Sequence, residues 1–296
     1  MVEIKTVGVL GGTGGLGTYI TKNLASSGLF DITVFTRGVN ASLPPGVKSA
    51  PINYDDVESL TESFKGQDAI VAVIPGHLAE LQFKPIEAAI KAGVHRFIPS
   101  EYGVDLRNPL LRKMPFMKTK LEIEQRLVDA AKEGKLTYTS IYGGGFVEWV
   151  LTYEELMPIS QRRFNIQNDG NRPFSITKMN DYAKAVVGAL SHPEETENEV
   201  MLVESYRPSQ LQILAAAREV LPGDWQVEYV DMDKNAEIAE QKMFAGQFDI
   251  PVVDPMVFKI MFTPGYGGQI DGIHNDLAGI TRMTEDELKE IIKSFA

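Results

Sequence analysis

The chain of 296 residues carries a formal net charge of −11 and contains no cysteine. The negative charge disfavours binding to nucleic acid or to an anionic membrane, because both are polyanions. Without cysteine, disulfides, thiolate nucleophiles and thiolate metal sites are excluded. The sequence opens without the long apolar segment of an export signal, so we expect a cytoplasmic protein.

The first half of the chain alternates short apolar segments with amphipathic ones. The apolar segments predict strands at residues 6–10, 32–36, 47–52, 69–74, 96–99 and 138–142. The amphipathic segments predict helices at residues 16–26, 56–64, 78–92 and 116–132. Such alternation forms βαβ units, which give a parallel sheet with helices on both faces. We therefore predict an α/β fold, with a Rossmann-type, doubly wound parallel sheet over residues 1–150.

The second half is less regular. Its patterns predict helices at residues 181–190, 208–220 and 235–244, and strands at residues 200–203 and 226–230. Residues 249–273, rich in proline, glycine and aromatic residues, support no clear assignment. Thr284 and Glu287 have capping-box spacing, which predicts a last helix that runs to Ser294. We expect residues 151–296 to form a smaller α+β region that binds substrate and packs on the first domain.

A glycine-rich loop stands between the first predicted strand and the first predicted helix. Its residues are Gly11, Gly12, Thr13, Gly14, Gly15, Leu16 and Gly17. In a βαβ unit, such spacing permits a tight turn, close approach of the backbone to a pyrophosphate and close packing of helix on strand. The N–H groups that begin the helix then face the phosphates. The loop predicts a dinucleotide-binding site; a glycine-rich turn without a ligand is the alternative.

The end of the second predicted strand indicates which dinucleotide binds. NAD sites commonly place a carboxylate there, about 20 residues past the loop, to bind the ribose hydroxyls. This strand ends instead at Thr36 and Arg37, and a guanidinium pairs well with the 2′-phosphate of NADP(H). We therefore expect NADP(H), with a solvent-exposed Arg37 as the alternative. Further cofactor contacts are expected where neighbouring strands end, at Asn53, Pro75, Gly76 and Ser100.

Several segments resemble one known family. None of the tyrosines is followed by a lysine four positions later, so the Tyr-x-x-x-Lys pair of classical short-chain dehydrogenases is missing. Residues 96–103, RFIPSEYG, closely resemble the signature of the NmrA-like and isoflavone reductase-like family of atypical short-chain dehydrogenases. The glycine loop, residues 120–127, the Gly144–Phe146 turn and the helix start at Asp181 resemble the same family. The resemblance covers nearly the whole chain, more weakly after residue 205.

The resemblance implies a catalytic lysine. In the family's reductases, a lysine on the helix that follows the signature faces the nicotinamide and is the proposed general acid or base. Lys118 and Lys120 both compete for this position. Counting from Lys120 places Ile123 and Leu127 on the apolar positions of the family pattern, so we choose Lys120. A solvated charge on an outer helix face is the alternative.

The same resemblance implies that Gly144 and Phe146 lie beside the cofactor. For a substrate pocket we expect Ser100, Tyr102, Phe146 and Trp149, although a turn or simple packing would explain these residues equally well. The four histidines are scattered and show no metal-binding spacing, so we expect no metal.

These features together predict an NADPH-dependent reductase. Its substrate would be a small lipophilic or aromatic ketone, enone or imine. The segments on the substrate side differ from those of the plant reductases, so the resemblance does not identify the substrate as a plant isoflavonoid or lignan. Two alternatives stay open: a non-catalytic NADP(H) sensor that binds a protein partner, and a redox-neutral isomerase. The oligomeric state does not follow from the sequence.

Overall fold

The computed structural model describes residues 3–38, 42–270 and 273–295. Within these ranges, seven parallel strands form one sheet in the order β10-β6-β5-β4-β1-β2-β3. Their bounds are β1 (Thr6–Leu10), β2 (Asp31–Thr36), β3 (Lys48–Pro51), β4 (Ala69–Ala72), β5 (Arg96–Ile98), β6 (Thr137–Tyr142) and β10 (Glu199–Leu202). The strand order reverses between β1 and β4, which is where doubly wound folds bind ligands. The predicted Rossmann-type α/β fold is confirmed.

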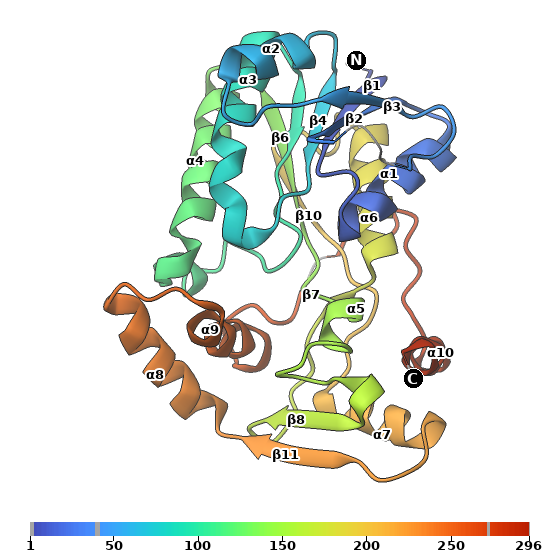
Figure 1. Ribbon diagram of the computed structural model, residues 1–296, viewed down its shortest axis with the longest axis vertical. Helices are drawn as coiled ribbons and strands as arrows, with labels where there is room; N and C mark the ends of the chain where they lie inside the picture. Colours follow the sequence, from blue (N-terminus) through green and yellow to red (C-terminus); the bar gives the residue numbers. More distant parts are fainter. Residues whose placement is uncertain (1–2, 39–41, 271–272, 296) are drawn as a thin grey trace.

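Helices cover both faces of this sheet (Figure 1). One face carries α1 (Gly15–Ser27) and α6 (Met179–Ser191); the other carries α2 (Val57–Phe64), α3 (Phe83–Ala92) and α4 (Lys118–Lys132). Side chains of a strand alternate between faces, so Val7 and Val9 of β1 pack toward α1 while Leu10 packs toward α2 and α3. Each fully buried aliphatic side chain of this kind contributes about 1.5–3 kcal/mol.

Two elements from beyond residue 150, the strand β10 and the helix α6, complete the sheet and its helical cover. β10 pairs in parallel with β6 along the register Glu199↔Thr139 to Leu202↔Tyr142. α6 packs against α1, and Asn23 donates a hydrogen bond to Asn180 across that contact at 2.9 Å. The chain therefore leaves the sheet through α5 (Val147–Val150) and β8 (Arg163–Gln167) and returns to complete it.

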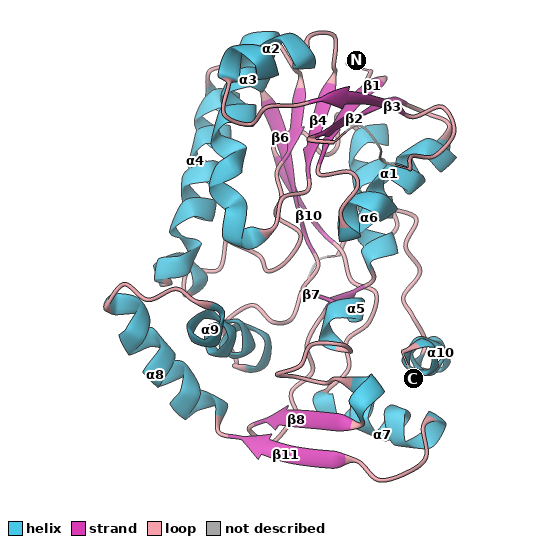
Figure 2. Ribbon diagram, in the orientation of Figure 1, coloured by secondary structure: helices cyan, strands magenta, loops and turns pink. Residues whose placement is uncertain are grey.

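The remaining elements form a smaller region below the sheet (Figure 2). β8 pairs in parallel with β11 (Gln226–Val230), and β7 (Gly145–Phe146) pairs with β9 (Ile176–Thr177). The helices of this region are α7 (Gln210–Val220), α8 (Met232–Phe244), α9 (Ile250–Phe262) and α10 (Glu285–Ser294). α10 has the predicted capping box between Thr284 and Glu287. β8 and α9 were absent from our predictions.

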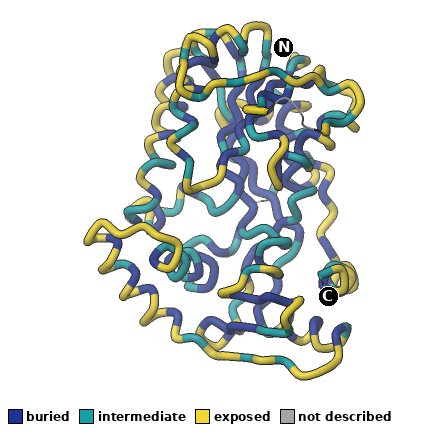
Figure 3. Tube along the Cα trace, viewed as in Figure 1, coloured by how far each residue is buried: buried dark blue, intermediate teal, exposed yellow. Residues whose placement is uncertain are grey.

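Buried residues concentrate in the central sheet, whereas α8 and the edge formed by β11 are largely exposed (Figure 3). None of the helices in the described ranges combines the length and the apolar character that crossing a membrane requires.

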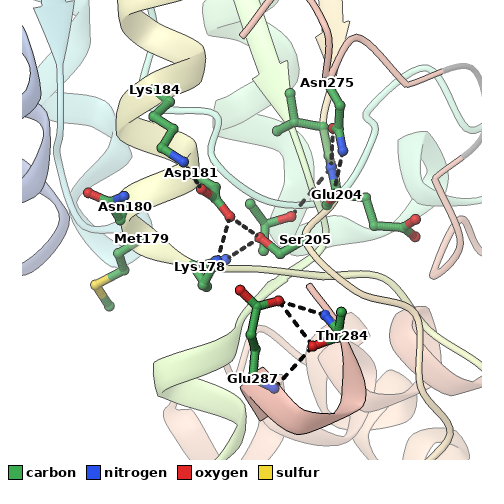
Figure 4. Close-up of polar contacts among 12 residues, drawn as sticks. Lys178, Met179, Asn180, Asp181, Lys184, Glu204, Ser205, Asn275, Thr284 and Glu287 are labelled. Carbon is green, nitrogen blue, oxygen red and sulfur yellow. Dashed lines mark hydrogen bonds and ion pairs between the residues drawn. The ribbon is translucent and has the colours of Figure 1, made fainter. Parts of the chain in front are cut away.

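A buried polar cluster ties α6 to the C-terminal segment (Figure 4). The Asp181 carboxylate accepts a hydrogen bond from Ser205 at 2.7 Å and pairs with Lys178 at 3.3 Å and Lys184 at 3.0 Å. The backbone N–H of Glu204, next to Ser205, donates to Oδ1 of Asn275, and the Asn275 amide donates back to the backbone carbonyl of Glu204. Buried carboxylates persist only when they are paired in this way. The Asp181 that resembles a family motif thus serves the fold.

Candidate cofactor and active site

The glycine loop joins β1 to α1 at the carboxyl edge of the sheet. Gly11 has φ +74°, and a Cβ at this position would lie 2.0 Å from the carbonyl oxygen of Val73. A Cβ on Gly17 would lie 2.0 Å from the carbonyl oxygen of Gly11, and one on Gly12 would lie 2.8 Å from Oγ1 of Thr21. The packing of the chain itself therefore requires glycine at Gly11 and Gly17.

At Gly14 and Gly15, by contrast, the packing of the chain would also accept a residue with a side chain. A Cβ on Gly15 would meet no described heavy atom within 4 Å, and one on Gly14 would meet only the Gly11 carbonyl oxygen, at 3.4 Å. Gly14 is the N-cap of α1, and no described side chain caps the helix there. The start of α1 therefore presents unpaired N–H groups to open space, while the side chain of Leu16 is buried beneath them. We call these N–H groups and the two glycines the phosphate cradle. Such a cradle fits a pyrophosphate.

Arg37 lies at the end of β2, beside this cradle in the sheet order. Its side chain is exposed and makes no ion pair with any residue that the structure describes. Thr36 shapes the turn, because its hydroxyl donates to the carbonyl of Gly38 at 2.9 Å and accepts from the Gly38 N–H at 3.0 Å. Burial raises the pKa of the Tyr54 phenol, and the nearby charge of Arg37 opposes that rise. Arg37 is thus a cation available to a phosphate.

Sequence reasoning missed a second cation at this place. A cavity of about 550 Å³ beside the glycine loop is lined by Thr13, Thr18, Lys22 and the segment from Ser42 to Pro45. Lys22 is exposed and has no ion-pair partner in the described ranges. The signal was available, since Lys22 stands four residues after Thr18 and so shares its helix face.

The ends of the other strands carry the remaining predicted contacts. Asn53 is exposed, and its Oδ1 accepts the N–H of Asp55 at 3.0 Å. Pro75 and Gly76 are exposed where a 3-10 helix, η1 (Gly76–Gln82), begins after β4. These residues border the same edge of the sheet as the glycine loop.

Ser100 is engaged with the chain itself. Its hydroxyl donates to the Ile74 carbonyl at 2.7 Å and accepts the Ile74 N–H at 2.9 Å, while its own N–H donates to Gln82 at 2.8 Å. The hydroxyl hydrogen is therefore used in joining the end of β4 to the end of β5, which supports the turn interpretation of this residue.

Lys120 and Glu101 form a partly buried ion pair. Nζ of Lys120 lies 2.8 Å from Oε2 of Glu101, and their side chains are 24% and 5% exposed. Burial raises the pKa of Glu101, and the Lys120 ammonium opposes that rise. Lys118 instead points outward, with 79% of its side chain exposed and only a 3.9 Å approach to Glu122. The structure thus brings Lys120, and not Lys118, to the end of β5.

An aromatic group stands next to this ion pair in the chain and in space. Tyr102, which follows Glu101, meets Tyr182 edge-on with ring centroids 5.9 Å apart. Phe146 meets the same Tyr182 at 5.1 Å. Tyr182 donates to the carbonyl of Gly144 at 2.8 Å. The structure therefore brings together the predicted residues Tyr102, Gly144 and Phe146 around Tyr182, which the sequence did not single out.

Two other predicted or signature residues serve packing. Trp149 stacks on Tyr153 at 4.5 Å and packs against the core of the C-terminal region. Arg96, the first residue of the family signature, is fully buried at the opposite end of β5, where it donates to Thr137 and to the carbonyl of Pro193, both at 2.7 Å. Burial lowers the pKa of Arg96 to about 10. Arg96 therefore stabilises the sheet away from the candidate site.

Metal-binding geometry is not found here. No set of three or more His, Asp or Glu side chains in the described part of the chain is grouped to hold a metal ion.

Known proteins resemble this chain in sequence and in fold. Oxidoreductase aprR of Aspergillus flavus is 30% identical over 300 residues, which span 99% of this chain and 99% of that one. Oxidoreductase poxI of Penicillium oxalicum is 31% identical over 243 residues, which span 79% of this chain and 76% of that one.

Among solved structures, the leucoanthocyanidin reductase–NADPH complex from Vitis vinifera matches with a TM-score of 0.78 at 19% identity, over 97% of this chain and 99% of that one. Pinoresinol-lariciresinol and phenylcoumaran benzylic ether reductases match with a TM-score of 0.77 at 18% identity, over the full length of both chains. At such identities the likeness concerns the fold. The sequence itself matches the NmrA-like family over residues 3–252, and the chain therefore belongs to that family.

Proposed function

We propose that this protein is an NADPH-dependent reductase in which Lys120 is the general acid or base. The proposal rests on one arrangement at the carboxyl edge of the parallel sheet. This edge carries the start of α1, which has no side-chain cap and begins at Gly14 and Gly15. It also carries the Lys120–Glu101 ion pair. Relatives with 30% and 31% identity are named oxidoreductases, which supports the same class of chemistry.

The residues present fit NADPH in two places. The N–H groups around Gly14 and Gly15 would bind the pyrophosphate, with Thr13 at the same turn. Arg37 and Lys22 would bind the 2′-phosphate, since both cations are exposed and neither has an ion-pair partner among the described residues. Bound NADPH would supply a hydride to an electron-poor carbon of the substrate.

Lys120 would handle the proton. Paired with Glu101, its Nζ is held at the sheet edge, so the carboxylate orients the group that donates to the substrate oxygen or nitrogen. Because 24% of the Lys120 side chain is exposed, its amine can recover a proton from water after each transfer. Phe146, which is only half-buried, offers aromatic surface to a lipophilic ketone, enone or imine, and the buried Tyr182 and Tyr102 pack behind it.

The test is turnover with a labelled cofactor. Purified protein is given NADPH carrying deuterium on the transferable position, together with a panel of aromatic and alicyclic ketones, enones and cyclic imines. We expect NADPH oxidation that depends on the substrate and deuterium in the product, detected by mass spectrometry. Tight NADPH binding in calorimetry without any transfer across the panel would instead favour the sensor hypothesis over the reductase.

A further inference from the structure

A second cavity lies in the C-terminal region, apart from the candidate active site. Its volume is about 500 Å³, which is in the range of small-molecule sites. Its lining residues come from β8, β11, α8, α9 and the segment after α5, elements that lie in the lower half of the molecule in Figure 1. The described residues that line it include none from the glycine loop, β5 or α4.

The cavity exists because helices cover a polar sheet face. In β8, Phe164 and Ile166 point into the apolar core, so Asn165 and Gln167 point the opposite way. Such a polar face normally meets water, yet Asn165 and Gln167 are only 8% and 3% exposed. The Asn165 carboxamide has no hydrogen-bond partner within the described chain, although it lines the cavity. The residue is more than nine-tenths buried and its amide still faces the cavity without a protein partner, so this group points to a ligand.

Negative charge gathers around the same cavity. Glu228 is the register partner of Asn165 in the β8–β11 pair, so the two side chains are neighbours. Asp254, in α9, accepts a hydrogen bond from the Tyr153 hydroxyl. Arg163, which pairs with Glu154, is the single cation among the described lining residues, and no lysine is present there. The electrostatic potential of the cavity therefore favours a cation.

The Tyr153–Asp254 contact leaves acceptor capacity open. Burial raises the pKa of Tyr153, and the hydrogen bond to Asp254 adds to that rise, so the phenol keeps its proton and acts as the donor. Burial also raises the pKa of Asp254, and the Tyr153 hydrogen bond opposes this. Only Oδ2 of Asp254 is engaged by Tyr153, and Oδ1 remains available to a donor in the cavity.

Apolar and aromatic side chains line the cavity beside these acceptors. Phe258 meets the Tyr153 ring edge-on, with centroids 6.4 Å apart, and Met232 and Val230 lie among the other lining residues. Aromatic faces attract ammonium groups as well as hydrocarbon. The cavity thus combines hydrogen-bond acceptors with apolar surface next to them.

We propose that this cavity binds a small organic ammonium ion, with its N–H groups on Asp254 and Asn165 and its apolar body against Phe258 and Tyr153. This site is separate from the proposed reductase centre and goes beyond that function, because NADPH binding and ammonium binding engage different residues.

Three ligands with the same phenylethyl body test the proposal on the full chain: 2-phenylethylammonium, neutral 2-phenylethanol and anionic 3-phenylpropanoate. Calorimetry and saturation-transfer NMR measure their binding with NADPH present. We expect the ammonium ion to bind at least about tenfold more tightly than the alcohol, and the carboxylate not to bind. Equal binding of ammonium and alcohol, or no ammonium binding at millimolar concentration, overturns the proposal.

Variants locate the site. Asp254→Asn and Asn165→Leu should each weaken ammonium binding by at least about tenfold, whereas Glu237→Gln, an exposed carboxylate on α8 outside the cavity, should leave it unchanged. Unfolding midpoints and NADPH affinity, measured on every variant, identify any that misfold. Undiminished ammonium binding in folded Asp254→Asn protein would also overturn the proposal, and neither result depends on reductase activity.

Discussion

Nζ of Lys120 donates a 2.8 Å hydrogen bond to Oε2 of Glu101 and so links the first turn of α4 to the end of β5. Lys118 cannot make this contact, because residues two apart on a helix point in directions about 200° apart. The Lys120 side chain is accordingly 24% exposed, whereas that of Lys118 is 79% exposed. A step of only two residues along α4 therefore separates a lysine at the candidate site from a lysine in solvent.

We expect Lys120→Arg to separate proton transfer from structure. Arginine keeps the charge pair with Glu101 but holds its proton too tightly to act as an acid or base. Reductase kcat should fall about 10²- to 10⁴-fold, while NADPH affinity and the unfolding midpoint stay near those of the wild type. Lys118→Arg is the matched control and should retain full activity. Comparable rates in both variants would argue against Lys120 as the acid or base.

We expect substitutions in the glycine loop to separate glycines needed for cofactor binding from glycines needed for folding. Gly14→Ala should leave the unfolding midpoint nearly unchanged, because its Cβ would have ordinary contact with the Gly11 carbonyl oxygen at 3.4 Å. It should weaken NADPH binding at least about tenfold, because the methyl group would obstruct close approach of a pyrophosphate. Gly17→Ala should instead lower the midpoint, since its Cβ would lie 2.0 Å from the same oxygen. Calorimetry and thermal unfolding measure the two effects, and unchanged NADPH affinity in Gly14→Ala would contradict the assigned cradle.

Arg37 should determine the preference for NADPH. We expect Arg37→Gln to weaken NADPH binding by about tenfold to a hundredfold and to leave NADH binding unchanged, because a hydrogen bond to a charged group contributes about 1.5–3 kcal/mol. Lys22→Gln should have the same sign and a smaller effect. Dissociation constants for both cofactors provide the measurement. An equal loss of NADH affinity would mean that Arg37 supports the fold and not the 2′-phosphate.

Asp68 should make stability depend on pH. Burial alone would raise the pKa of Asp68, but hydrogen bonds from the N–H groups of Thr6 and Lys5, both at 2.8 Å, outweigh it, and the pKa lies below its ordinary value of 3.8. A carboxylate whose pKa is lower in the folded chain stabilises the fold above its unfolded-state pKa, and this contribution disappears as pH falls through the folded-state pKa.

The unfolding midpoints of wild type and Asp68→Asn should therefore differ at pH 7 and converge below about pH 4. Glu237→Gln, an exposed carboxylate on α8, is the control and should show no such convergence. A difference that is constant over the whole pH range would mean that the Asp68 charge makes no contribution.

Local patterns predicted most of the sheet. β1 and β11 have the predicted bounds, and α1, α2, α7 and α10 begin and end within two residues of them. These segments have strong periodicity or clear capping signals, and such signals act over a few residues. α9 remained unassigned because its segment contains Pro251 and Pro255, and proline usually indicates the end of a helix. Pro251 is tolerated because it stands in the first turn, where its nitrogen needs no hydrogen-bond partner. β8 was missed because its alternation, RFNIQ, is short and its polar face is buried only by distant helices.

The sequence by itself determined the glycine loop, the cation at the end of β2 and the pair of lysines that begin α4, since spacing along the chain sets each of them. Tertiary structure decided what spacing cannot express. Folding brought Glu101 to Lys120, used the hydroxyl of Ser100 to join two strands, and placed Tyr182 between Tyr102 and Phe146. It also buried Asn165 beside Glu228, residues 63 positions apart that become neighbours only when β8 and β11 pair. These contacts join distant parts of the chain, so their energies depend on the packed structure and leave no pattern in any local segment.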